Sequence, residues 1–188
     1  MLFTVCSLFF LVILKTSTCQ KSQKQSGNYD VQITYIGSCG QNGNYSEQMG
    51  FVQTRMSKTN RTYACLSGIF ALPYGLSDDM QETWELFVKG STGGWKRFIT
   101  FNNKKACSDK RRLYPKWFKM LNIKDVPCPI PRGNYTVDCD RAAGWKFSQA
   151  KTLTYGEYKA IVNFYHNKEN IGCTDFRANI VPMADEIQ

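Results

Sequence analysis

The stretch Pro127-Cys-Pro-Ile-Pro-Arg-Gly-Asn-Tyr-Thr-Val137 combines a cysteine, three prolines and a glycine turn ahead of a strand-like segment. Proline fixes φ and has no N–H to donate, so Cys128 is excluded from the hydrogen-bonded ladder of a central strand. Arg132 and Gly133 favour a turn, after which Tyr135 and Val137 alternate as in a strand. We therefore expect Cys128 to form a disulfide that pins a loop to the rim of a β structure.

The segments on either side of this stretch alternate apolar and polar residues, as half-buried strands do. Strands are expected over residues 29–36, 51–55, 62–72, 83–89, 95–101 and 156–166, with a possible further strand at 144–151 and a last one carrying Cys173, Phe176, Ala178 and Ile180. The fold class is therefore all-β: an antiparallel two-sheet cup or sandwich of about eight strands.

Residues 108–122 break the strand pattern. They begin with Ser108 and Asp109, which resemble a helix cap, and Pro115 divides them. One or two short helical turns are expected here, with Trp117, Phe118 and Leu121 close together. We find no repeat, linker or low-complexity region, so residues 20–188 are interpreted as one domain.

Residues 2–14 are almost wholly apolar and are followed by the small residues Ser17 and Thr18. This pattern is typical of a secretory signal peptide, here residues 1–19, and the run is too short to span a bilayer comfortably. Removing it leaves 23 basic and 15 acidic side chains, a net charge of +8. A secreted, extracellular protein with this charge favours anionic partners, such as lipid head groups or sulfated glycans, and nucleic acid is not expected.

Six cysteines remain after the leader is removed: Cys39, Cys65, Cys107, Cys128, Cys139 and Cys173. An even number in a secreted chain predicts three disulfides, although the number alone leaves their pairing open. Three glycosylation sequons, at Asn44, Asn60 and Asn134, agree with export.

Two motifs, Cys128-Pro-Ile-Pro-Arg-Gly-Asn-Tyr135 and Gly156-Glu-Tyr158 through Gly172-Cys173, resemble the GM2-activator family of lipid-binding proteins, with Trp145 near the family's spacer tryptophan. The full layout is similar to the insect chemosensory protein B (CheB) group, through Tyr63 to Gly68, the Trp84 strand and Lys105-Ala-Cys107. The resemblance implies a β-cup around an apolar cavity for acyl chains. It also implies the disulfides Cys39–Cys173 and Cys107–Cys128, which leave Cys65 to pair with Cys139.

Aromatic and apolar side chains could line such a cavity or form an ordinary packed core. The resemblance favours the cavity for the set as a whole. The candidates are Trp84, Trp95, Phe98, Phe101, Trp117, Phe118, Leu121, Trp145, Phe147 and Phe164.

A dense basic cluster accompanies the helical segment. It contains Lys104, Lys105, Lys110, Arg111, Arg112, Lys116 and Lys119. Lys110, Arg111, Arg112 and Lys116 are the candidates for binding an anionic head group or a membrane surface, and a solvated face is the alternative.

The sequence shows no arrangement of residues typical of a catalytic site. His166 is the single histidine and lies beside a predicted turn, disulfide-bonded cysteines cannot act as thiolates, and the pairs Asp78/Asp79 and Asp138/Asp140 have no evident partner. No cofactor is expected, and one histidine without a Cys-x-x-Cys motif gives no metal site.

We therefore expect a non-enzymatic protein that binds lipid or another hydrophobic small molecule, and the CheB likeness suggests insect chemosensation with a receptor or membrane partner. Two alternatives stay open: a protein that presents glycolipids to a hydrolase, and a basic protein that binds glycans or membranes without a cavity.

Overall fold

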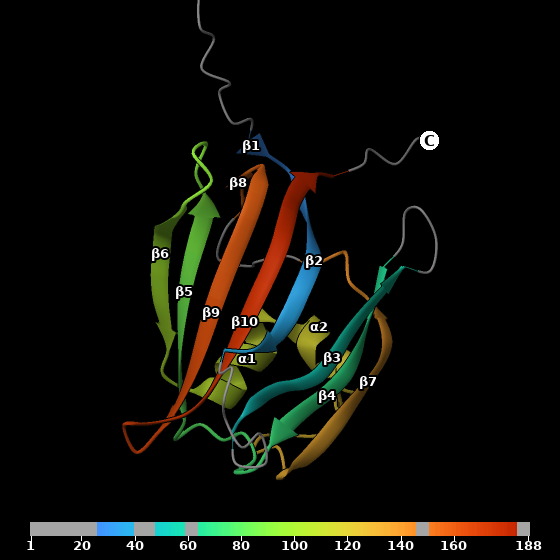
Figure 1. Ribbon diagram of the computed structural model, residues 1–188. Coiled ribbons are helices and arrows are strands. Elements are labelled where there is room, and N and C mark those ends of the chain that lie inside the picture. Colours follow the sequence, from blue (N-terminus) through green and yellow to red (C-terminus); the bar gives the residue numbers. More distant parts are fainter. Residues whose placement is uncertain (1–25, 40–47, 59–63, 146–150, 184–188) are drawn as a thin grey trace, which may run out of the picture.

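The structure is a computed structural model, and we describe residues 26–39, 48–58, 64–145 and 151–183. Two antiparallel sheets dominate it (Figure 1). The five-stranded sheet contains, in spatial order, β2 (Tyr29–Ser38), β10 (Glu169–Pro182), β9 (Gly156–His166), β5 (Gln81–Lys89) and β6 (Trp95–Asn103). The three-stranded sheet contains β3 (Gly50–Lys58), β4 (Ala64–Leu72) and β7 (Gly133–Arg141). The predicted all-β, two-sheet fold class is confirmed.

Short elements complete the chain. Strand β1 (Ser26–Gly27) pairs with β8 (Leu153–Thr154), and two helices, α1 (Ala106–Leu113) and α2 (Pro115–Met120), follow β6. Most of the further strand expected at 144–151 cannot be compared, since residues 146–150 lie outside the described residues. Trp145 forms an isolated antiparallel β-bridge with Val31. The strand expected at 51–55 is longer than predicted, since β3 begins at Gly50 and continues to Lys58.

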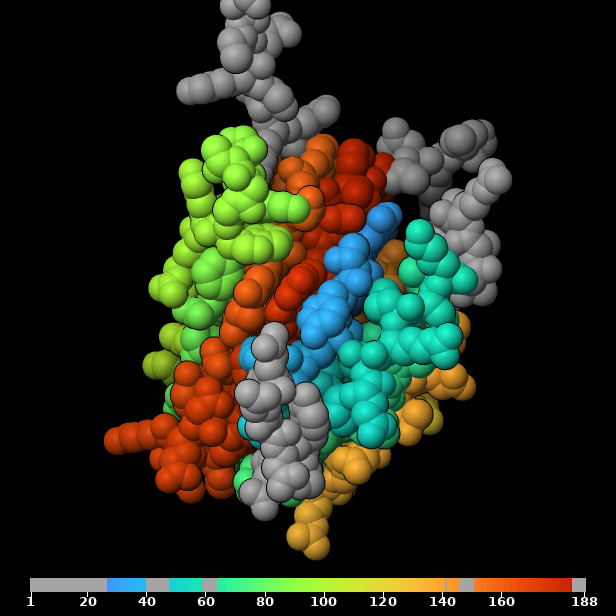
Figure 2. Space-filling view, in the orientation of Figure 1, coloured from blue at the N-terminus to red at the C-terminus, as the bar shows by residue number. Residues whose placement is uncertain are grey.

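One face of the five-stranded sheet points outward. Figure 2 shows this face, on which β9, β10 and β2 run side by side and β3 continues the surface beyond β2. The opposite face is the inner one, because Tyr158, Ala160, Val162 and Phe164 of β9 are all buried while the residues between them are partly exposed. This alternation is what the sequence predicts for β9.

The helical segment lies between the two sheets and contacts both. The Trp117 ring of α2 packs edge-on against Phe70 of β4, with centroids 5.0 Å apart. Tyr114, between the helices, stacks on Trp84 of β5 at the same centroid distance of 5.0 Å. Both sheets therefore share one hydrophobic core with the helices, and the split into two helices at Pro115 agrees with the sequence, since proline is favoured at a first helical position.

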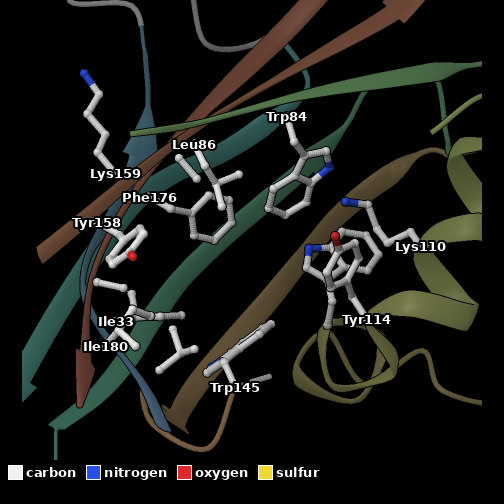
Figure 3. Close-up of a pocket in the computed structure, with 14 residues that line it drawn as sticks. Ile33, Trp84, Leu86, Lys110, Tyr114, Trp145, Tyr158, Lys159, Phe176 and Ile180 are labelled. Carbon is white, nitrogen blue, oxygen red and sulfur yellow. The ribbon is translucent and has the colours of Figure 1, made fainter. Parts of the chain in front are cut away.

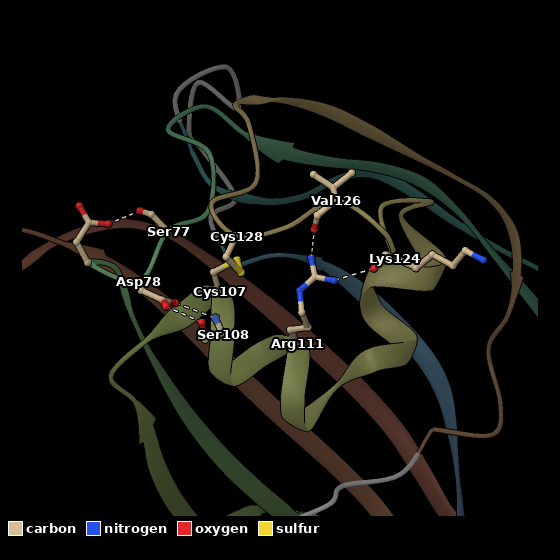
Figure 4. Close-up of a disulfide and its surroundings, with 9 residues drawn as sticks. Ser77, Asp78, Cys107, Ser108, Arg111, Lys124, Val126 and Cys128 are labelled. Atoms are coloured by element: carbon tan, nitrogen blue, oxygen red, sulfur yellow. Dashed lines mark hydrogen bonds between the residues drawn. A yellow bond between two sulfur atoms is a disulfide. The ribbon is translucent and has the colours of Figure 1, made fainter.

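The start of α1 differs from the expectation. The helix begins at Ala106, so Ser108 lies inside its first turn and does not cap it. Asp78, from the loop before β5, caps the helix instead. It accepts hydrogen bonds from the Ser108 backbone N–H at 2.8 Å and from the Ser108 hydroxyl at 2.5 Å (Figure 4). Burial acts to raise the pKa of Asp78, but these hydrogen bonds and the nearby Lys105 outweigh it and lower that pKa below its usual value of 3.8.

Acid is expected to weaken this cap. Because the folded-state pKa of Asp78 is depressed, its stabilising contribution is complete above pH 3.8 and is lost as the pH falls through the folded value. Asp78→Asn should lower the free energy of unfolding at pH 6 by about 1 kcal/mol or less, since the carboxylate is exposed. Urea unfolding at pH 6 and pH 3 checks this: the gap between wild type and variant should shrink at pH 3, and a constant gap would contradict the assignment.

All three disulfides have the expected partners. Cys39 pairs with Cys173, Cys65 with Cys139, and Cys107 with Cys128. Cys128 lies in a loop outside the sheets, as the surrounding prolines predict, and its disulfide ties that loop to the start of α1 (Figure 4). The Arg111 guanidinium reinforces the same tie, because it donates hydrogen bonds to the carbonyls of Lys124 and Val126.

Gly172 sits where the chain has no room for a side chain. A Cβ at this position would lie 2.0 Å from the Met49 carbonyl oxygen and 2.7 Å from the Met49 nitrogen, and both are backbone atoms. Gly172→Ala should therefore lower the free energy of unfolding by about 3 kcal/mol, because the backbone must shift to accept one methyl group. Chemical unfolding measures this, and Gly94→Ala, where a Cβ meets nothing within 4 Å, is the matched control.

Candidate functional site

A cavity lies between the inner face of the five-stranded sheet on one side and the two helices and Trp145 on the other (Figure 3). Its sheet wall is mainly apolar and consists of Val31, Ile33, Leu86, Ala160, Phe176, Ala178 and Ile180. Larger side chains complete the lining: Trp84, Lys110, Tyr114, Trp117, Trp145 and Tyr158. Lys159 also borders it, but its ammonium lies 5.9 Å from the centroid of the Phe87 ring and points away from the cavity in Figure 3.

Strand register explains why these residues meet. Trp84 pairs with Val162 and Leu86 with Ala160, so residues of one parity on β5 and β9 share the inner face. The same register continues across β10, where Phe176 pairs with Ala160. The cavity wall is therefore a direct product of the alternation that the sequence shows.

The cavity is small in this structure. The space open to the centre of a water molecule is about 60 Å³. One water molecule occupies roughly 10–15 Å³, so the cavity has room for only a few water molecules. A larger ligand would have to displace wall side chains, of which Trp145 is partly exposed.

A buried ion pair forms one end of the cavity. The Lys110 ammonium lies 2.6 Å from Glu82 Oε1, and the two side chains are 4% and 0% exposed. The other carboxylate oxygen of Glu82 accepts hydrogen bonds from Trp84 Nε1 at 3.1 Å and from Asn103 Nδ2 at 3.2 Å. The buried Glu82 carboxylate is thus compensated by one ammonium group and two neutral hydrogen-bond donors, as buried carboxylates normally are.

The remainder of the Lys110 ammonium faces aromatic rings. Its nitrogen is 4.8 Å from the Trp117 ring centroid, 5.4 Å from that of Phe164 and 5.5 Å from that of Trp84. These distances fall within the range of cation–π attraction. Two tyrosines add hydroxyl groups to the lining: burial raises the pKa of Tyr158, and burial together with the Glu82 carboxylate raises that of Tyr114, so both stay neutral.

The aromatic residues singled out in the sequence occupy different places. Trp84, Trp117 and Trp145 line the cavity, and Phe101 stacks on Trp84 with centroids 5.6 Å apart. Phe118, Leu121 and Phe164 are buried in the core beside it without lining it, and Phe147 lies outside the described residues.

Trp95 and Phe98 lie on the edge strand β6 and are 40% and 50% exposed, so neither is in the cavity lining. Leu86 pairs with Ile99 while Phe87 pairs with Arg97, which makes Phe98 the extra residue of a β-bulge. The Phe98 ring packs edge-on against Tyr158, a cavity residue, at 6.0 Å. Exposed apolar surface on β6 therefore adjoins the cavity wall.

The four basic candidates are also separated. Lys110 is buried in the ion pair with Glu82, which corrects the expectation that it belongs to an exposed basic face. Arg111 is held by two backbone carbonyls, and Lys116 donates to the Ala143 carbonyl at 2.5 Å and lies 5.0 Å from the Trp145 ring centroid. Arg112 is exposed and pairs with Asp109 at 3.0 Å. Only part of the basic cluster is left facing solvent.

Sequence reasoning did not single out Glu82, Tyr114 or Tyr158 as site residues. A signal for Glu82 existed: it precedes Trp84 by two positions and so shares the inward parity of Trp84 and Leu86. A signal for Lys110 existed too, because it precedes Leu113 by three residues and Trp117 by seven, the spacing of one helix face.

A Ser77–Asp79–His166 chain is the arrangement closest to a catalytic site among the described residues. The Ser77 hydroxyl donates to Asp79, and His166 Nε2 lies 3.1 Å from the other Asp79 oxygen. The carboxylate stands between serine and imidazole, whereas activation of a serine needs the imidazole next to the hydroxyl. Within the described ranges, no group of three or more possible metal ligands occurs.

Comparisons with known proteins give little. No family model matches the chain, and no curated protein matches it either. Among solved structures, it is similar to the crystal structure of chicken MD-1 complexed with lipid IVa, at 9% identity and a TM-score of 0.37, over 81% of this chain and 91% of that chain. Across the described residues, no helix is long and apolar enough to cross a bilayer.

Proposed function

We propose that this protein is a secreted, non-enzymatic carrier that binds a lipid or another hydrophobic small molecule between the five-stranded sheet and the helical segment. The observation that carries the proposal is the cavity itself. Protein interiors are close-packed and contain few voids larger than a water molecule, yet here the inner sheet face leaves one against a mostly apolar wall. A mostly apolar wall favours an apolar ligand, of which each buried methylene group contributes roughly 0.8 kcal/mol.

The cavity must widen to take a long chain. Phe98 and Ile99 are exposed on β6, and Phe98 contacts Tyr158 of the cavity lining, so exposed apolar surface adjoins the cavity on this side. Opening along this side breaks no disulfide, because none of the three involves β5, β6 or β9. The proposed ligand therefore enters past β6.

The sequence resemblance to GM2-activator and CheB proteins supports this function and suggests its setting, the detection of lipids by an insect chemosensory organ. A basic, cavity-free surface binder is less well supported, since Lys110, Arg111 and Lys116 all have partners within the protein. Cleavage of residues 1–19 and glycosylation at Asn44, Asn60 and Asn134 belong to the same proposal. Of these, only Asn134 lies in the described residues, exposed at the start of β7.

Filling the cavity should abolish ligand binding without unfolding the protein. Ala160 lies on the cavity wall at the middle of the inner face, so Ala160→Phe places a ring in the empty space. Native mass spectrometry of protein secreted from insect cells should show a co-purifying lipid in wild type and none in the variant. Thr34→Phe, which adds the same ring to an exposed position of β2, is the control and should keep the lipid. A lipid retained by Ala160→Phe would move the binding site elsewhere.

A further inference from the structure

The cavity carries charge at one end only. Lys110 lies beside Trp84, whereas the opposite end is formed by Val31 and Ile180 (Figure 3). Strand register places the row containing Ile180 six residues beyond the row containing Trp84, about 20 Å along the sheet at roughly 3.3 Å per residue. A ligand that occupies the cavity therefore meets an ammonium group at one end and a mostly apolar lining over the rest of its length, where the Tyr158 hydroxyl and Trp145 Nε1 are the polar atoms.

The Lys110 ammonium has hydrogen-bonding capacity to spare. An ammonium has three N–H donors, and among the described residues Glu82 alone supplies it with an oxygen, at 2.6 Å. The remaining donors face the rings of Trp84, Trp117 and Phe164, which attract the charge but accept no conventional hydrogen bond. The side chain is 4% exposed, so solvent outside the cavity does not satisfy these donors.

The charge of Lys110 is already neutralised. Glu82 is fully buried and its carboxylate is bound by Lys110, Trp84 and Asn103, so the pair as a whole brings no net charge to the cavity. A second carboxylate placed beside Lys110 would leave one uncompensated negative charge in an apolar site, which is costly. An uncharged oxygen would take the unused donors without this cost.

We infer that Lys110 is a polar anchor at one end of the cavity, and that it binds the oxygen of an uncharged head group, such as an alcohol, aldehyde, ketone or ester, on an otherwise apolar chain. The inference rests on the proposed function and deepens it by giving the ligand class and its direction. The ligand lies with its polar group at the Lys110 end of the cavity and its apolar tail toward Val31 and Ile180.

The test compares three probes of one chain length: dodecanol, dodecanoate and dodecane. Their dissociation constants are measured at neutral pH with wild type, Glu82→Gln and the double variant Glu82→Gln/Lys110→Met. Wild type should bind dodecanol about tenfold more tightly than dodecanoate. Glu82→Gln should reverse that order, because the freed ammonium then pairs with the carboxylate. In the double variant, the affinity for dodecanol relative to dodecane should fall about tenfold from its wild-type value.

Lys119→Met, which removes an exposed charge from α2, is the matched control and should leave all ratios at their wild-type values. Equal dodecanol-to-dodecane ratios in wild type and the double variant would overturn the anchor while leaving the carrier function in place. A preference of the wild-type protein for dodecanoate over dodecanol would also overturn the anchor. This measurement does not depend on whether any variant folds. Failure of all three probes to bind wild type would instead overturn the proposed function, and the anchor with it.

Discussion

Lys110→Met is expected to lower the free energy of unfolding by about 4 kcal/mol, because it leaves the Glu82 carboxylate buried without its counter-ion. Trp84 and Asn103 would still donate to that carboxylate, but two neutral donors do not replace an ammonium at 2.6 Å. The loss should appear in urea unfolding as a lower midpoint with an unchanged slope, since the folded core stays the same size.

A double variant distinguishes the effect of the two charges on stability from the effect of side-chain packing. Glu82→Gln/Lys110→Met removes both charges and keeps side chains of similar volume, so it should recover most of the loss and lie within about 1 kcal/mol of wild type. Lys119→Met, at an exposed site, should change the free energy of unfolding by less than about 0.5 kcal/mol. If the double variant is as unstable as Lys110→Met, the pair does not act as a compensated buried charge.

Removing the Cys39–Cys173 disulfide through the double serine variant should cost about 4 kcal/mol. The bond joins Cys39, directly after β2, to β10 across a sequence separation of 134 residues, and a cross-link that closes a long loop restricts the unfolded chain most. The double serine variant at Cys107 and Cys128, where the separation is 21 residues, should cost about 3 kcal/mol. Chemical unfolding of both variants checks the order, and a larger loss from the shorter loop would contradict the loop-length explanation.

The sequence predicted the β architecture well because alternation is a local property. The alternation in residues 156–166 predicts a half-buried strand, and in β9 the alternate residues Tyr158, Ala160, Val162 and Phe164 are all buried. The disulfide partners came from the family resemblance, since the number of cysteines does not determine which of them meet. All three predicted pairs are present in the structure.

The site was predicted less well because its parts depend on positions that strand patterns do not encode. Trp95 and Phe98 are large aromatic residues in a predicted strand, as core residues often are, but β6 is an edge strand, and sequence does not reveal which strand lies at an edge. Lys110 was grouped with its basic neighbours, although the helix turns it toward Glu82 on a distant strand. The contact between these two charges depends on the tertiary fold. The sequence indicates only that each side chain faces inward, through the parity of Glu82 and the helical spacing of Lys110.

The bulge at Phe98 also affects how one molecule meets another. An edge strand with unpaired N–H and C=O groups can recruit a strand from a neighbouring chain, and exposed Trp95 and Ile99 would strengthen such pairing. The extra residue interrupts the regular spacing of those groups, and the charges of Lys96 and Arg97 lie on the same short segment. The strand can thus present apolar side chains to a ligand while remaining a poor template for aggregation.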